Sequence, residues 1–146
     1  MVGNANVTLP TSGSFIYSFA GGPNPTNASG AVGSWAGGAF NVTFGSTSGS
    51  MSVSTPLVLS VGGFSYQMSA CASGCTFTNA STVAGNMVLN GSCSGGACAT
   101  STPATANAAG IFVGPQGAGL AVAGNINVPS QPTTVPVATF AGAFKR

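Results

Sequence analysis

Hydrophobic and polar side chains alternate with a period of two along most of the chain. Alternating runs occupy residues 15–19, 40–44, 57–61, 64–68 and 120–128. Successive side chains of a β-strand point to opposite faces, so each run predicts a strand with one buried and one exposed face. No 11-residue window has the three-to-four-residue apolar spacing of an amphipathic helix. The pattern therefore predicts an all-β protein.

Short turn sequences separate the alternating runs. Gly62 and Gly63 join two runs through two residues, which is typical of a hairpin turn whose residues need positive φ. The sequence from Gly114 to Gly117 predicts another tight turn, because Pro115 presets its own φ angle. The predicted strands cover residues 14–20, 34–44, 50–61, 64–71, 75–83, 85–92, 107–114, 118–128 and 136–144.

Strands that follow one another through short connections usually pair antiparallel. About eight such strands, each with one apolar face, predict a small antiparallel up-and-down β-barrel. A two-sheet β-sandwich is the alternative. Gly37 and Gly38 interrupt the second predicted strand and indicate a bulge or bend. We expect residues 9–146 to form a single barrel domain and residues 1–8 to form an N-terminal arm or edge strand.

The chain is almost free of charge, which narrows the possible functions. Its 146 residues include no Asp, Glu or His, and the only charged side chains are Lys145 and Arg146. Acid–base catalysis and metal sites rely mainly on the missing residue types. Nucleic-acid binding needs several Lys and Arg contacts to phosphates. We therefore expect no enzymatic activity, no metal, no cofactor and no nucleic-acid partner.

No membrane span is expected either, because no stretch approaches about 18 uninterrupted apolar residues. An outer-membrane barrel is a further alternative that the number and length of the strands would allow. It is disfavoured because Ser and Thr occupy the alternate face of the strands.

The four cysteines form two closely spaced pairs, Cys71 with Cys75 and Cys93 with Cys98. An even number of cysteines in a chain rich in Ser, Thr and Gly indicates two disulfides. The short intervening loops would place the two members of each pair opposite each other on a hairpin. Pairing between the two loops is the alternative, and it would close longer chain loops. A zinc site is also compatible with the spacing.

Trp35, Tyr17 and Tyr66 are candidate ligand-binding residues, because sugars stack on aromatic rings. The structural interpretation is that they belong to the core. Tyr17 and Tyr66 alternate in phase with apolar neighbours, which favours the core.

Several segments resemble a known family. The segments are Leu9-Pro10-Thr11, Tyr17-Ser18-Phe19-Ala20-Gly21-Gly22, Pro25-Thr26 and Asn41-Val42-Thr43-Phe44-Gly45. Together they resemble the C-terminal domain of FecR-domain-containing proteins of Gram-negative bacteria. The segment Gly110-Ile111-Phe112-Val113-Gly114-Pro115 resembles the strand–turn–strand signature of transferrin-binding-protein-like β-barrels, and Phe140-Ala141-Gly142-Ala143-Phe144 also fits.

The resemblance covers most of residues 9–144. It implies an eight-stranded barrel outside the cytoplasm, in the periplasm, at the cell surface or secreted. Such domains usually carry an Asp in the loop after Pro25-Thr26, where this chain has Asn27.

Two functional hypotheses follow. In the first, the barrel is a structural, self-assembling protein that forms a homo-oligomer, filament or surface layer. Near-zero charge promotes association, and the strands carry no charges to protect their edges. In the second, it is a ligand-binding module that recognises a glycan or a neutral protein surface through Asn, Gln, Ser and aromatic side chains.

Overall fold

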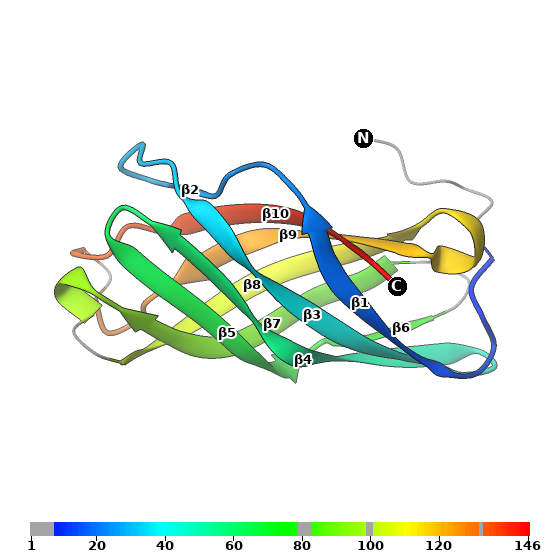
Figure 1. Cartoon of the computed structure of the whole chain (residues 1–146). Coiled ribbons are helices and arrows are strands. Elements are labelled where there is room, and N and C mark those ends of the chain that lie inside the picture. Colours follow the sequence, from blue (N-terminus) through cyan, green and yellow to red (C-terminus); the bar gives the residue numbers. More distant parts are fainter. Residues whose placement is uncertain (1–7, 79–82, 99–100, 132) are drawn as a thin grey trace.

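The computed structural model describes residues 8–78, 83–98, 101–131 and 133–146 (Figure 1). These residues form ten β-strands and two short 3-10 turns, with no α-helix among them. The elements are β1 (Ser14–Gly21), β2 (Thr26–Asn27), β3 (Ser34–Phe44), β4 (Ser48–Val61), β5 (Phe64–Ser73), β6 (Thr76–Thr78), β7 (Val83–Ser94), η1 (Gly96–Cys98), β8 (Thr102–Val113), η2 (Pro115–Gly117), β9 (Gly119–Asn127) and β10 (Ala138–Lys145).

Eight of the strands close into an antiparallel barrel. They follow the order β1-β3-β4-β5-β7-β8-β9-β10, and β1 also pairs with β10, which completes the ring. The two remaining strands are short: β2 pairs with the start of β10 on the side that β1 occupies further along, and β6 lies between β4 and β7. The predicted up-and-down barrel is therefore confirmed, and the two-sheet sandwich is wrong.

The inward side chains fill the barrel with an aromatic and aliphatic core. The fully buried Phe112 ring lies 5.9 Å from Tyr17, 5.6 Å from Phe44 and 4.8 Å from Phe77, measured between ring centroids. Tilted and edge-to-face pairs of this kind each add about 0.5–1.5 kcal/mol beyond burial of their area. The outward positions of the same strands carry mainly Ser, Thr, Asn and Ala.

Most strand boundaries agree with the sequence prediction within two residues. The clearest difference is β8, which begins at Thr102 rather than at residue 107. Pro103 pairs with Ser92 of β7, whereas the pairing of β8 with β9 begins only at Thr105. A proline is tolerated here because Pro103 precedes the start of the β9 pairing, so β8 has a neighbour on one side only at this position and a missing N–H need not interrupt a ladder.

The segment around Cys71 and Cys75 differs in topology from the prediction. It was expected to form a hairpin, but β5 and β6 both run antiparallel to β7 and therefore point in the same direction. They are two parts of one barrel strand with an irregular excursion between them. The predicted strands 75–83 and 85–92 correspond to β6 and β7, and residues 79–82 lie outside the described part.

The predicted bulge in the second long strand is confirmed. The register between β3 and β4 shifts at Gly37 and again after it. Gly38 has φ of 151°, and a Cβ atom there would lie 2.4 Å from Leu57 Cδ2 and 2.9 Å from Leu57 Cα. Only glycine combines this backbone conformation with such a close approach of β4.

The end of the barrel that carries η2 is closed by residues near both ends of the chain. Leu9 is buried, and its Cδ2 atom lies next to Gly117. Arg146 donates a hydrogen bond from Nη2 to the Gln116 carbonyl at 2.9 Å and places its guanidinium 4.1 Å from the Phe15 ring centroid. Of the predicted arm, residues 1–8, only Thr8 lies within the described part.

The two tyrosines are fully buried but differ in their hydrogen bonding. Tyr17 Oη donates to the Gly117 carbonyl at 2.6 Å. Tyr66 Oη has no hydrogen-bond partner among the described residues. Burial raises the pKa of both phenols, and the charge of Arg146 partly opposes this rise in the pKa of Tyr17.

Phenylalanine substitutions should separate these two environments. We expect Tyr17→Phe to lower the free energy of unfolding by about 1–2 kcal/mol, because it leaves the Gly117 carbonyl without a partner. Tyr66→Phe should leave that free energy unchanged or raise it by up to about 1 kcal/mol, because it removes an unpaired buried hydroxyl. Urea unfolding at pH 7 measures both. Equal losses in the two variants would contradict the assignment.

Stability should be flat from about pH 3.5 to about pH 8, since no Asp, Glu or His is present to titrate. Above about pH 10 the tyrosines of the unfolded chain lose protons before those of the folded chain, so stability should fall as pH rises. Urea melts at pH 4, 7.5 and 10.8 test this, with the Tyr17→Phe/Tyr66→Phe variant as control. A control that loses as much stability at pH 10.8 would rule out the tyrosines as the cause.

Candidate functional site

The wall of the ring has a gap between β4 and β5. Strand β4 pairs with β5 only from Leu57 to Val61 and with β6 only from Ser48 to Ser50. Between these two stretches, β4 has strand partners only on its other side, in β3. The β4 residues 51–56 therefore lack a strand partner on the β5 side.

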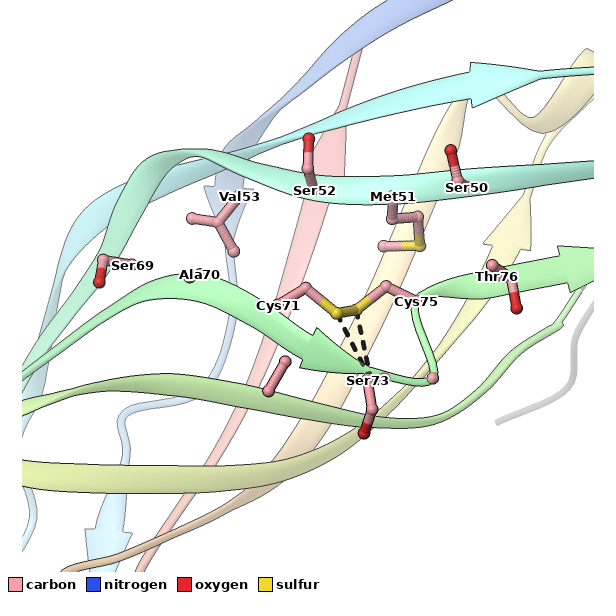
Figure 2. Close-up of a pocket in the computed structure, with 12 residues that line it drawn as sticks. Ser50, Met51, Ser52, Val53, Ser69, Ala70, Cys71, Ser73, Cys75 and Thr76 are labelled. Atoms are coloured by element: carbon pink, nitrogen blue, oxygen red, sulfur yellow. Dashed lines mark hydrogen bonds between the residues drawn. A yellow bond between two sulfur atoms is a disulfide. The ribbon is translucent and has the colours of Figure 1, made fainter.

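The Cys71–Cys75 disulfide lies in this gap, as Figure 2 shows. The two Cα atoms are 6.4 Å apart, and both sulfur atoms face the Ser73 carbonyl oxygen, at 3.4 and 3.7 Å. Register shifts between β5 and β7 occur on each side of Ala70 and Cys71. The disulfide closes the excursion at the place where the chain leaves the regular ladder.

The second disulfide joins Cys93 and Cys98, with 5.6 Å between the Cα atoms. It lies beside η1, at the end of the barrel away from η2 (Figure 1). This disulfide links the end of β7 to η1. The cross-strand partner of Cys93 is Thr102 of β8 and not Cys98. Both predicted pairings are therefore present, although neither disulfide spans a simple hairpin. The crossed pairing and the zinc site are wrong, because all four sulfurs are engaged in these two bonds.

The gap opens into a groove of about 500 Å³. Its apolar lining includes Met51, which is buried, and Val53 and Cys71, which are half-buried and pack against the core. Exposed hydroxyl residues surround this apolar part: Ser50, Ser52, Ser69, Ser73 and Thr76. The groove thus combines an apolar floor with a polar, uncharged rim.

Both ends of the groove are closed by backbone hydrogen bonding. At one end the Met51 amide donates to the Cys75 carbonyl at 2.7 Å. At the other end Leu57 of β4 is paired with Met68 of β5. The opening in the barrel wall is therefore bounded by paired backbone at both ends, and it is not a free strand edge.

The aromatic candidates from the sequence do not meet in this groove. Tyr17 and Tyr66 have no exposed surface and belong to the core, so a surface platform that needs their rings is wrong. Trp35 is half-buried and stacks on Phe19 at 4.7 Å between ring centroids. The buried Trp35 Nε1 has no hydrogen-bond partner among the described residues.

A second surface lies on the outer face of β8, β9 and β10. Cross-strand pairing aligns small apolar residues in two rows. One row is Ala109, Ala123 and Ala141, and the other is Ile111, Ala121 and Ala143. We call these six residues the alanine wall; all of them are exposed or half-buried. A shallow hollow of about 370 Å³ borders it beside Asn86 and Asn107.

The groove presents neutral hydroxyl groups and apolar side chains. The groove hydroxyls have no carboxylate or imidazole beside them, because the chain contains none. Hydrogen bonds and apolar contacts are what the groove offers a ligand. Among the described residues, no group of three or more His, Cys, Asp or Glu side chains is placed to hold a metal ion.

Comparison with known proteins found no matching family model, no matching curated protein and no matching solved structure. None of the described helices has the length and apolar character needed to cross a membrane.

The sequence did not predict the groove, although it carried two of its signals. Ser residues at alternate positions from 48 to 54 indicate a polar outward face, and the short Cys71–Cys75 spacing indicates a local excursion. The gap depends on which segments pair with β4. A periodicity of two predicts which side chains point inward but not which strands pair.

Removing the disulfides should destabilise the protein unequally. Each disulfide closes a short loop and so limits the conformational entropy of the unfolded chain. Removing that limit should lower the free energy of unfolding by about 2 kcal/mol in either case. The Cys71→Ala/Cys75→Ala variant should lose about that amount. Cys93→Ala/Cys98→Ala should lose more, because both side chains are fully buried and their removal leaves space in the core. Urea unfolding measures both losses, and a smaller loss for the second variant would contradict this account.

Proposed function

We propose that this barrel is a non-catalytic, structural domain whose outer surface associates with further copies of itself. The alanine wall carries the proposal. Its side chains are uncharged and, apart from Ile111, small, so two copies can approach closely with few long side chains to order. Of the two charged side chains in the chain, Lys145 lies on the same outward face of β10 as Ala143 and borders one end of the wall.

The fold changes the expected mode of association. Strands without charged side chains favour association through exposed edges, but closure of the ring pairs the edges that an open sheet would expose. Association through a sheet face is therefore more plausible physically than addition of strands. Packed sheet faces usually lie about 10 Å apart, and small side chains allow two faces to approach more closely than that.

We also propose an extracytoplasmic location in a Gram-negative bacterium and kinship with FecR-associated or transferrin-binding-like barrels. Two disulfides are typical of oxidising compartments, which supports the location. The closed eight-stranded barrel is the architecture that the sequence resemblance implies. The bacterial origin and the kinship rest on the resemblance alone.

Ligand binding is the second candidate function, and the groove is the observation that favours it. Its volume of about 500 Å³ lies within the usual range of small-molecule sites. A domain that assembles on a surface can also present such a groove to a glycan or a neutral protein surface.

A pair of charge substitutions tests self-association. Ala123→Lys places an ammonium group in the alanine wall, and Gln67→Lys places one at an exposed position of β5. Both variants raise the net charge equally, so only the position differs. We expect Ala123→Lys to weaken association at least about 10-fold and Gln67→Lys to leave it nearly unchanged. Sedimentation velocity from 1 to 200 μM measures the oligomers.

A wild-type protein that remains monomeric over that concentration range, at both low and high salt, would refute self-association. Equal weakening by the two substitutions would show that net charge matters and that the alanine wall is not the contact surface.

A further inference from the structure

We propose that the groove between β4 and β5 binds one compact, uncharged ring that carries hydroxyl groups, such as a single pyranose unit of a neutral glycan. The inference rests on ligand binding, the second candidate function, and it assigns a site and a ligand class to that function. It moves the glycan site from the aromatic residues considered in the sequence to the disulfide-braced gap in the wall.

The shape of the groove favours a compact ligand over an extended one. A peptide strand inserted into the wall would need about 4.8 Å on each of its two sides. The wall is closed at both ends, by the Met51–Cys75 hydrogen bond and by the Leu57–Met68 pair. An extended chain therefore has no path along the gap, whereas a single ring can enter from outside.

The lining matches the two kinds of surface that a sugar ring presents. Figure 2 shows Met51 and the disulfide in the space between the strands, where they form an apolar floor for the C–H face of a ring. The hydroxyls of Ser52 and Ser69 lie among the residues around it. Each hydroxyl both donates and accepts hydrogen bonds, as sugar hydroxyls do.

The backbone of β4 supplies further polar groups. Residues 51–56 have strand partners only in β3, and on the β5 side the Met51 amide is taken up by Cys75. The remaining amide and carbonyl groups on that side can bind ligand hydroxyls as well as water. Backbone groups fix the position of a ring without selecting for charge.

Electrostatics select against ionic ligands. No charged side chain lines the groove, and the only two in the chain lie elsewhere, at Lys145 and Arg146. A phosphate or uronate group would lose part of its hydration without gaining a partner of opposite charge. Binding should accordingly be independent of salt concentration.

Titration with methyl β-D-glucopyranoside and methyl β-D-galactopyranoside, followed by amide NMR, tests the proposal. We expect at least one glycoside to shift the amide resonances of residues 50–53 and 69–76, with a dissociation constant on the order of 1 mM. The affinity should change less than two-fold between 20 and 500 mM NaCl. No groove shift with either glycoside at 50 mM would overturn the proposal.

Two arginine substitutions locate the site. Ala70→Arg places a long side chain on the rim of the groove, and Ala20→Arg places one at an exposed position of β1. We expect Ala70→Arg to weaken binding at least 10-fold and Ala20→Arg to leave it unchanged, with both amide spectra remaining those of the folded barrel. Binding that survives Ala70→Arg would overturn the assignment to this groove.

A third probe separates failure of the ring assignment from failure of ligand binding. The uncharged peptide Gly-Ser-Thr-Ser-Gly is titrated in the same way. If it shifts the groove amides and the glycosides do not, the ring proposal is overturned while ligand binding stands. If none of the three probes shifts the groove amide resonances, the ring proposal and ligand binding by the groove are both overturned. Self-association is measured independently, with the Ala123→Lys variant.

Discussion

The pairing of β1 with β10 is the contact on which the rest of the structure depends. It closes the ring through Ser18 with Lys145, Phe19 with Phe144, and Gly21 with Ala143, and its register shifts once within this short stretch. By contrast, β9 and β10 pair continuously from Ala138 to Lys145. Most β-proteins protect open edges with charged side chains. This chain has no charged side chain before Lys145, so closure of the ring is its main protection against edge-to-edge association.

Closure also imposes the aromatic core. Eight strands leave an interior that side chains can just fill, and large rings occupy it from several strands. Phe144 of the closing strand packs edge-to-face on Phe40 and Phe19, at 5.1 and 5.7 Å between ring centroids. These contacts lie beside the β1–β10 seam, so hydrophobic packing reinforces the place where the hydrogen-bonded ladder is shortest. The seam and the core therefore stabilise each other.

Periodicity was sufficient to predict the barrel but not the site. Alternation fixes which side chains point inward, and this identified Tyr17 and Tyr66 as core positions, because a slip of one residue would expose both of them. The groove arises because β5 and β6 pair with separate stretches of β4 and leave residues 51–56 without a strand partner on that side. Which stretches pair is decided by contacts between segments distant in sequence, and local alternation does not encode them.

Because the chain is almost free of charge, neutral side chains hold its loops by hydrogen bonds and no ion pairs are needed. Asn27 is buried, and its Oδ1 accepts hydrogen bonds from the Ser29 and Ala31 amides at 3.0 Å each. A carboxylate would accept the same two bonds, so the amide preserves the loop geometry without a buried charge. Its Nδ2 lies close to Gly62, where it would be only 2.5 Å from an added Cβ.

Asn27 illustrates how neutral side chains can hold the loops of this barrel in place of ion pairs. Polar side chains of the described loops, such as Asn27 and Thr134, bond to backbone amides or to other neutral groups, and these hydrogen bonds are insensitive to salt and to moderate changes in pH. The same neutrality governs what the outer surface and the groove can recognise. With no electrostatic steering, partners must be selected by shape and by hydrogen-bond pattern. Rigid features such as the closed wall and the disulfide-braced groove are well suited to that kind of recognition.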